Sequence, residues 1–279
     1  MYYNDINVTI QEAFEPSVGL INRALIVTHE LEVPFMKLRG TSAISDLRTE
    51  LIRLATLGGL TLGGLTIPLP TILNQVNLAC PINEKAIVLL TSQSDSSGNA
   101  IVPDYLYVCG SLIVDYQNAT DVSGLTSIIA ANTTVESDFW GIIPVQYNTK
   151  LVEWLVTFCS SKSKAFFVDT EYKHFTITDL LKSNRGYMIY NGRTGDQANQ
   201  QFAAGVYGRC FSGESLVGVK WKTVTGITSY KQATLSDSEV STLAANGVNT
   251  YLYRYGKGSI DGSFTTDSDG NLKAVNHID

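Results

Sequence analysis

The sequence predicts an α/β fold with some α+β character, in which helices flank a mixed and mainly parallel sheet. The first observation is that strand-like and helix-like segments alternate from Phe139 to Tyr255. The second is that 44% of the 279 residues are hydrophobic, enough to fill one large core or two modest ones. The third is a pair of strand-like ends, which predict an N-terminal strand arm and a C-terminal β-hairpin.

The first half of the chain supplies four predicted strands and one helix. Asp5 to Ala13 alternates apolar and polar residues, as a half-buried strand does. Uninterrupted apolar runs predict buried strands at 23–28, 86–91 and 105–109. Leu47, Leu51 and Leu54 recur at helical spacing, which predicts a helix over Ser45 to Leu57 that ends at Gly58-Gly59. The duplicated LGGLT at 57–66 then predicts a pliable connector or an insertion.

The second half alternates regularly. We expect strands at 139–145, 165–168, 187–190 and 248–255, and helices around 151–159, 178–182 and 198–210. Ser236-Asp237-Ser238-Glu239 forms a capping box, with Leu235 and Val240 placed as a hydrophobic staple, and Asn246-Gly247 marks the end of that helix. The tail predicts a hairpin that turns at Asp269-Gly270.

These segments suggest three regions. Residues 1–15 form the N-terminal arm, residues 16–138 form an N-terminal part that contains the Gly-rich connector at 57–66, and residues 139–279 form the α/β core region.

Composition and charge exclude several classes of protein. Charged residues make up 16% of the chain and its net charge is −6, which argues against a nucleic-acid surface. The N-terminus does not resemble a signal peptide, and no apolar run approaches the roughly 20 residues that span a bilayer. The four cysteines are widely separated and are expected to be buried thiols of a protein assembled in a reducing cytoplasm. These residues are Cys80, Cys109, Cys159 and Cys210.

No histidine or glycine pattern predicts a reactive or ligand-binding site. His29, His174 and His277 are not spaced as a metal pair, and ordinary polar roles are expected for them. Gly213 to Gly218, which contains Ser215, is one residue too long for a nucleophile elbow. Gly256-Lys257-Gly258-Ser259 imitates the end of a phosphate-binding loop, but it lacks the first glycine and the Ser or Thr after the lysine, and no helix is expected after it.

Acidic and aromatic patterns are equally weak. Asp267 to Asn271 suggests a calcium loop, but a hairpin turn explains it better. There are two carboxylate pairs, Asp169 with Glu171 and Asp237 with Glu239. Neither pair has a histidine, a lysine or a set of metal ligands nearby in the sequence. A row of tyrosines on one strand could stack on bases or sugars, although packing inside the protein or between subunits is the preferred interpretation. These are Tyr251, Tyr253 and Tyr255. We therefore predict no catalytic, cofactor-binding or metal-binding residue and no cofactor.

Several motifs follow one another along the chain in the same order as in a known family of proteins. Phe139-Trp140-Gly141-Ile142-Ile143 is followed by a helix and by Lys164 to Thr170. The segment AAGVYGR at 203–209 precedes GVKWKTVTGIT at 218–228, and a capped helix and strand follow at 235–251. The series resembles contractile phage tail sheath proteins, in particular sheath-like proteins of phages and defective prophages. The likeness covers residues 139–279 well and the N-terminal half loosely.

The resemblance implies a structural role without enzymatic activity. A sheath subunit polymerises as stacked hexameric rings around a tail tube protein, exchanges terminal strands with neighbouring copies, and resides in the virion tail after assembly in the host cytoplasm. Residues 1–15 would be the exchanged N-terminal arm. Relatives continue past the position of Asp279 with a helix and a second arm, so this chain is expected to lack that arm. No nucleic acid or membrane partner is implied.

Two other functions remain open from the sequence. One is an α/β hydrolase or nucleotide-binding enzyme that uses Asp169, Glu171 or Ser215. The other is a carbohydrate-binding surface or baseplate module that uses the tyrosine row.

Overall fold

The structure is a computed structural model. It describes residues 22–30, 33–56, 61–62, 65–66, 81–95, 97–132, 139–170, 185–191, 201–212, 223–226, 230–231, 236–245, 248–254, 257–261, 264–266 and 272–274.

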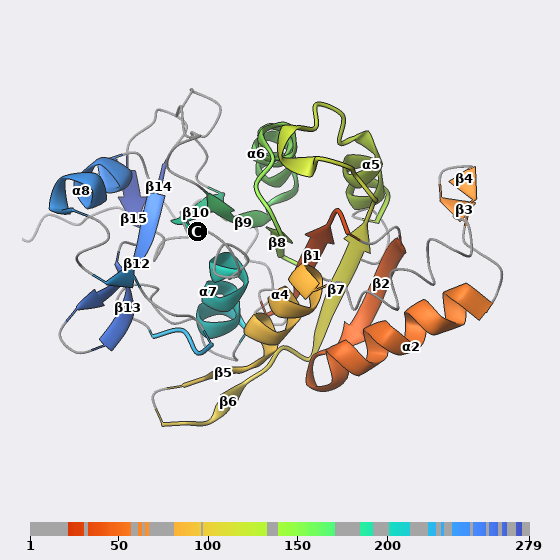
Figure 1. The fold of residues 1–279 in the computed structure, drawn as a ribbon, viewed down its shortest axis with the longest axis horizontal. Helices are drawn as coiled ribbons and strands as arrows, with labels where there is room; N and C mark the ends of the chain where they lie inside the picture. Colours follow the sequence, from red (N-terminus) through yellow and green to blue (C-terminus); the bar gives the residue numbers. More distant parts are fainter. Residues whose placement is uncertain are drawn as a thin grey trace, which may run out of the picture.

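A nine-stranded sheet forms the centre of the fold (Figure 1). Its spatial order is β11-β12-β10-β9-β8-β1-β7-β2, and β13 pairs with β12. Among the described strands of this sheet, only the pairs β2–β7 and β12–β13 are antiparallel, which confirms the predicted mixed and mainly parallel sheet. The strands are β1 (Ala24–Thr28), β2 (Val33–Arg39), β7 (Tyr105–Gly110), β8 (Gly141–Pro144), β9 (Ala165–Thr170), β10 (Gly186–Tyr190), β11 (Tyr230–Lys231), β12 (Val248–Arg254) and β13 (Lys257–Asp261).

Strand β1 is the point at which the strand order reverses. It pairs in parallel with β7 on one side and with β8 on the other. After β1 the chain forms the edge strand β2 and returns to β7, which lies between β2 and β1. It then crosses β1 to β8 and continues through β9 and β10. The sheet therefore joins strands from both sides of residue 139.

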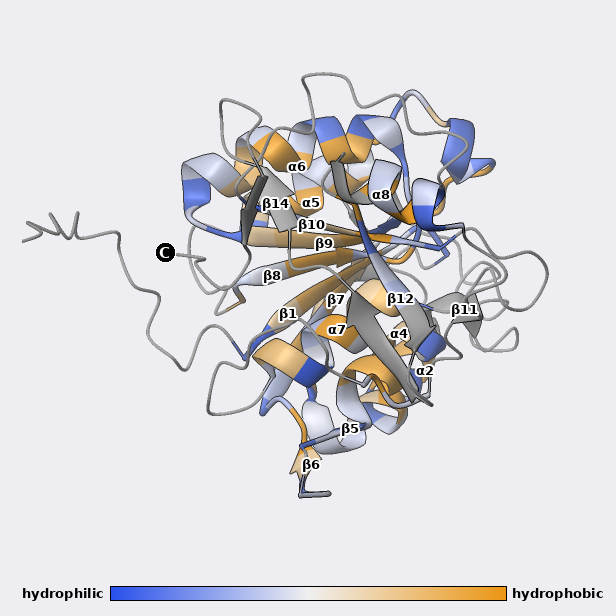
Figure 2. Ribbon diagram, turned by 90° about the vertical axis from the view of Figure 1, so that its left-hand side faces the viewer, coloured by the Kyte–Doolittle hydropathy of each residue, from blue (hydrophilic) through white to orange (hydrophobic). Residues whose placement is uncertain are grey.

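Helices cover both faces of the sheet (Figure 2). One face packs against α2, α4 and α7, and the other packs against α5 and α6. Helix α8 lies against β12. The two buried clusters are separated by the sheet, because alternate strand residues point to opposite faces. The helices are α2 (Ala43–Thr56), α4 (Pro81–Thr91), α5 (Ser123–Asn132), α6 (Thr149–Lys162), α7 (Phe202–Phe211) and α8 (Asp237–Ala245), with 3-10 turns η1 (Gly40–Ser42) and η2 (Tyr116–Asn118).

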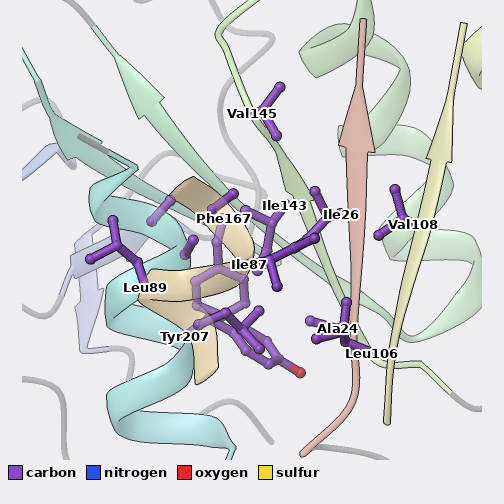
Figure 3. Close-up of a cluster of buried hydrophobic side chains, with 14 of the residues drawn as sticks. Ala24, Ile26, Ile87, Leu89, Leu106, Val108, Ile143, Val145, Phe167 and Tyr207 are labelled. Atoms are coloured by element: carbon purple, nitrogen blue, oxygen red, sulfur yellow. The ribbon is translucent and has the colours of Figure 1, made fainter. Parts of the chain in front are cut away.

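Helix α7 is the centre of the larger core. All ten of its residues are buried. Tyr207 packs edge-on against Phe167 of β9, with ring centroids 4.9 Å apart, and Figure 3 shows both beside Ile143. Two glycines permit the close approach: a Cβ at Gly208 would collide with the Leu90 carbonyl of α4, and a Cβ at Gly141 would collide with the Tyr207 ring.

Most predicted elements that lie in the described residues are confirmed. The strands at 23–28, 105–109, 139–145, 165–168, 187–190 and 248–255 correspond to β1, β7, β8, β9, β10 and β12, and the four expected helices correspond to α2, α6, α7 and α8. The predicted tail hairpin is present as β14 (Phe264–Thr266) paired with β15 (Leu272–Ala274), although its turn at 267–271 lies outside the described residues.

The strand predicted at 86–91 is wrong, because this segment is the last half of α4. Pro81 occupies the first helical position, where its missing N–H costs nothing. Ile87 and Leu90 are buried while Val88 is 48% exposed, which is the one-sided burial of a helix. A short apolar run cannot distinguish the two structures by periodicity alone.

Some short elements were not predicted. These are β2, α5, β13 and the pair β5 (Gln93–Ser94) with β6 (Ala100–Ile101). Within the expected connector at 57–66, β3 (Thr61–Leu62) pairs with β4 (Leu65–Thr66). The predicted strand at 5–13 and helix at 178–182, together with Leu235 and Asn246-Gly247, lie outside the described residues.

Candidate functional site

Open α/β sheets bind ligands at the carboxyl ends of the strands where the strand order reverses, and in this sheet those strands are β1 and β8. His29 follows β1 and Asn148 follows β8, while Tyr116 lies in η2 beyond β7. The His29 ring stacks on the Tyr116 ring, with centroids 4.5 Å apart and planes 7° from parallel.

Asn148, which follows β8, forms hydrogen bonds to the chain in and after η2. Its Nδ2 donates to the Tyr116 carbonyl at 2.6 Å and to the Ala119 carbonyl at 2.9 Å, and its Oδ1 accepts from the Leu151 N–H at 3.0 Å. The asparagine thus caps α6 while it holds the chain around η2 in place. At the reversal point, these contacts are made by the protein's own side chains and backbone.

The chain between β7 and η2 continues the pairing with β1 beyond the sheet. The Ser111 N–H donates to the Thr28 carbonyl and the Ile113 N–H to the His29 carbonyl, each at 3.2 Å. Leu112, which lies between Ser111 and Ile113, is 50% exposed, and Val114, which follows Ile113, is 89% exposed. Two branched apolar side chains therefore project from the carboxyl edge of the sheet.

His29 packs as an uncharged ring against Tyr116. Burial lowers its pKa to about 4, so the imidazole is neutral at physiological pH. Its Nδ1 is buried and has no hydrogen-bond partner in the described part of the chain. A catalytic base needs an orienting partner and a reactive group within reach, whereas the contact that the structure gives His29 is the Tyr116 ring.

Asp169 is the last residue but one of β9 and lies at the N-terminus of α7. Its two oxygens accept from the Phe202 N–H at 3.0 Å and the Ala203 N–H at 2.9 Å. Burial raises the pKa of this carboxyl to about 7, against the opposing effect of the bonds from Ala203, Phe202 and the Asn191 side chain. A helix N-terminus can bind a ligand anion, but here an internal carboxylate takes that position. Its predicted companion Glu171 lies outside the described residues.

Tyr251, the first residue of the tyrosine row, is not exposed and cannot serve as a stacking surface for a ligand. This side chain is buried, and its ring lies 5.9 Å from that of Phe202. Its hydroxyl accepts from the Val224 N–H at 3.1 Å and lies 3.3 Å from the Val224 carbonyl, to which it donates. The preferred interpretation, packing inside the protein, is confirmed for Tyr251. The Tyr253 side chain and Tyr255 lie outside what the structure describes.

The remaining sequence patterns that can be located have structural roles. Lys257 begins strand β13, so the imitation of a phosphate-binding loop leads into a strand. The capping box is confirmed: Glu239 Oε2 accepts from the Ser236 N–H at 2.7 Å, and Ser236 Oγ accepts from the Glu239 N–H at 3.3 Å. The bonds that the Glu239 carboxylate accepts from the N–H and the Oγ–H of Ser236 lower its pKa. Asp237 lies in the first turn of α8.

Three cysteines are free and buried, as expected: Cys109, Cys159 and Cys210. Among the residues that the structure describes, no group of three or more His, Cys, Asp or Glu side chains could hold a metal ion. Within the same residues, no helix is long and apolar enough to cross a membrane. The candidates at His174, His277, Cys80, 213–218 and 267–271 lie outside the described residues.

Asn148 was not singled out from the sequence, although a signal for it exists. It directly precedes the apolar helical stripe of α6, where asparagine is among the favoured N-cap residues. Its bonds to the carbonyls of Tyr116 and Ala119 have no such signal, because they join residues that are distant in sequence. The role of Asp169 as a cap for α7 is hidden for the same reason.

Comparison with known proteins gives distant likenesses to solved structures alone. No family model matches the chain, and no curated protein matches it. Among solved structures, it is similar to the sheath tail protein DSY3957 from Desulfitobacterium hafniense, with 10% sequence identity and a TM-score of 0.42. The likeness covers 88% of this chain and 72% of that one.

Proposed function

We propose that this protein is a structural subunit of a contractile phage tail sheath, or of a phage-tail-like sheath, and that it acts without enzymatic chemistry. The observation that carries the proposal is the burial of the residues on which the resemblance rests. Gly141, Tyr207 and Gly208 belong to the motif series and pack against one another or against α4. Buried motif residues fix how the helices pack on the sheet. A subunit that polymerises needs such a fixed shape, because its surfaces must fit those of neighbouring copies.

The two positions at which an α/β fold would most readily bind a ligand support the same proposal. At the carboxyl ends of β1 and β8 lie the His29–Tyr116 stack and the hydrogen bonds of Asn148. The N-terminus of α7 contains the carboxylate of Asp169. In both places the groups that would meet a ligand contact the protein itself.

A surface for contact with other copies is available on the α5–α6 face. Helix α5 contains no charged residue, and its outward residues are small. The exposed Leu112 and Val114 precede it in the chain. Removing such a surface from water on assembly is favourable, because no charge has to be desolvated. We propose that this surface, formed by Leu112, Val114 and the outward side of α5, contacts a neighbouring subunit.

Strand exchange between subunits would use the edge of the sheet opposite β2. Pro34 removes a backbone donor from β2, and the register of β2 on β7 shifts between Val33 and Met36. A proline, a bulge and an edge lysine, here Lys37, are devices that discourage further strand pairing. We therefore propose that a neighbour's arm, such as residues 1–15, adds near β12 and β13 by β-augmentation.

In this role the nine-stranded sheet and its helices move as one rigid body. An extended lattice of stacked hexameric rings would relax to a shorter and wider one, while the exchanged strands keep neighbouring subunits joined. The partners are copies of this chain and a tail tube protein. The site of action is the virion tail, after assembly in the host cytoplasm.

Electron microscopy of the full chain mixed with its tail tube protein tests the proposal. We expect ringed or tubular assemblies around the tube. Replacing Leu112 and Val114 together by Asp should abolish them, while Ile52→Asp on α2, which is similarly exposed, should leave them intact. Monodisperse monomers in the presence of tubes would contradict the sheath function. Assemblies that survive the double replacement would contradict only the proposed surface.

The alternatives have less support. A carbohydrate site built on the tyrosine row loses Tyr251, which is buried. For an enzyme, Asp169 would have to act while it caps α7. A thermal-shift screen with nucleotides and divalent metals is the direct test of the enzyme alternative, and a shift of several degrees would favour it.

A further inference from the structure

The two edges of the sheet, at opposite ends of its parallel strands, differ in charge. Strands β1, β7, β8, β9 and β10 run in the same direction (Figure 1). The residues that precede these strands therefore lie at one edge, here called the amino edge, and the residues that follow them lie at the other, the carboxyl edge. A difference in charge between the two edges gives each subunit a direction.

Three cations lie in a row at the amino edge. Arg23, Lys164 and Arg185 directly precede β1, β9 and β10. Backbone hydrogen bonds join the starts of neighbouring strands here: the Arg23 carbonyl accepts from the Trp140 N–H at 2.9 Å, and the Trp140 carbonyl accepts from the Ala165 N–H at 3.1 Å. The three basic residues therefore begin strands that are held side by side.

This row lies on the α5–α6 side of the sheet. Phe139 belongs to the buried cluster on that side, and Lys164 Nζ lies 3.9 Å from the centre of its ring. Burial raises the pKa of the Cys159 thiol in α6, while Lys164 and Arg185 are near enough to oppose that rise. Lys162, the last residue of α6, is exposed and adds a further cation at the same edge.

The described carboxylates at the amino edge do not balance these cations. Lys37 of β2 is exposed and reaches toward this edge, with Nζ 4.2 Å from the centre of the Tyr105 ring. Asp104 directly precedes β7, and Asp46 forms an ion pair with Arg39 at 3.2 Å. The described part of the amino edge therefore has a net positive charge.

The carboxyl edge has acidic residues instead. Glu30 lies two residues after β1, while Asp115 and Asp121 lie beyond β7, before and after η2. Both aspartates are exposed. The sequence has no Lys or Arg from residue 86 to residue 149, so the chain that follows β7 supplies no basic residue to this edge.

The acidic residues surround the exposed apolar side chains of the same edge. Leu112 and Val114 immediately precede Asp115. Lys150, at the start of α6, forms an ion pair with Glu153 at 2.9 Å, so this pair adds no net charge. The described part of the carboxyl edge is thus a negatively charged surface with an apolar patch in it.

We propose that the amino edge of one copy binds the carboxyl edge of a second copy, so that copies of this chain associate head to tail. The opposite charges attract, and contact removes Leu112 and Val114 from water. The two edges are different surfaces of one subunit, so each contact leaves a free edge of each kind, and the association continues from copy to copy. The inference rests on the contact between copies proposed above, for which it names the partner surface, and it does not require a tail tube.

Sedimentation velocity of the full chain at about 50 mM and about 500 mM NaCl is the first test. At the lower salt concentration, the sedimentation coefficient should rise with protein concentration. The association constant should fall about tenfold or more at the higher salt concentration, because salt screens exposed charges. A monomer under both conditions, or an association that does not respond to salt, would overturn the proposal. This measurement uses the wild type and does not depend on whether any variant folds.

Variants that block one edge test the direction of the contact. Val114→Lys with Gln117→Lys blocks the carboxyl edge, and Lys37→Glu with Lys162→Glu blocks the amino edge; all four positions are exposed. Each double variant alone should remain monomeric at low salt. An equimolar mixture should form one-to-one dimers and nothing larger, because each variant retains the edge that the other lacks.

A matched control adds the same charge elsewhere. Ser45→Lys with Ile52→Lys changes one polar and one apolar exposed residue of α2 and should associate like the wild type. Folding of every variant is checked by circular dichroism. If a folded double variant assembles like the wild type, or if the mixture forms no dimer, the head-to-tail contact is wrong. Tail-tube assemblies that form without head-to-tail association would overturn this inference and leave the sheath proposal standing, whereas the converse result would contradict the sheath proposal alone.

Discussion

The two faces of the sheet are covered in different ways. On one face, α7 is buried along its whole length and packs against both the strands and α4. On the other face, α5 and α6 form a single layer, and α5 buries only Leu125 and Ile129 of its ten residues. Both α5 and α7 are rich in small residues. In α7 these residues permit close packing inside the molecule, whereas in α5 they lie on the outside.

The difference shows that the structural role of small residues in a helix depends on what the helix packs against. Gly208 of α7 meets the backbone of α4, where no side chain could move aside. Gly124 of α5 meets only the Ser111 side chain. The same residue type is a requirement of the core on one face of the sheet and a feature of the outer surface on the other. The predictions below test this contrast.

The largest expected effect is that of Gly208→Val. A Cβ at this position would collide with the Leu90 carbonyl, so α4 and α7 would have to separate. Overpacking of a tight core costs about 3 kcal/mol or less in most cases, and we expect a loss near the top of that range. Urea unfolding measures it. Ala130→Val on the exposed side of α5 is the control and should change stability by less than about 0.5 kcal/mol. Equal effects of the two changes would contradict the contrast.

A smaller loss is expected for Asn148→Ala on the α5–α6 face. The change removes the cap of α6 and leaves two carbonyls around η2 without their donor. We expect a loss of about 2 kcal/mol, measured by thermal or urea unfolding. Asn132→Ala is the matched control, since its amide donates only to the Ile128 carbonyl within α5 among the bonds that are shown. A loss no larger than that of the control would mean that the loop around η2 is held by other contacts.

The smallest effect is the pH dependence from His29, at the edge between the two faces. Burial lowers its folded pKa to about 4, below the unfolded value of 6.5, so the unfolded state binds the proton more strongly. The contribution of His29 is therefore full above pH 6.5 and is lost as pH falls toward 4. Because the ring is partly exposed, we expect only about 1 kcal/mol. His29→Phe keeps a ring beside Tyr116 and should remove this part of the acid-side loss in urea unfolding. An undiminished loss would assign it to another group.

Local patterns determined much of the secondary structure. The apolar runs of β1, β7 and β9, the helical stripes of α2 and α6, and the Ser236–Glu239 box each act within a few residues, so the sequence predicts them. The segment 86–91 shows the limit of such patterns. Its apolar run fits a strand or a buried helix equally well, and the packing of α4 against α7 decided between them.

Tertiary structure alone decided the strand order, the burial of α7 and the use of Asp169. The sequence predicted a helix that contains the AAGVYGR segment and a strand that ends directly before Asp169. It could not show that Gly208 meets Leu90 or that Asp169 caps α7 from a distance of 33 residues. Contacts between distant segments depend on how the whole chain is arranged, and no local spacing of residues records that arrangement.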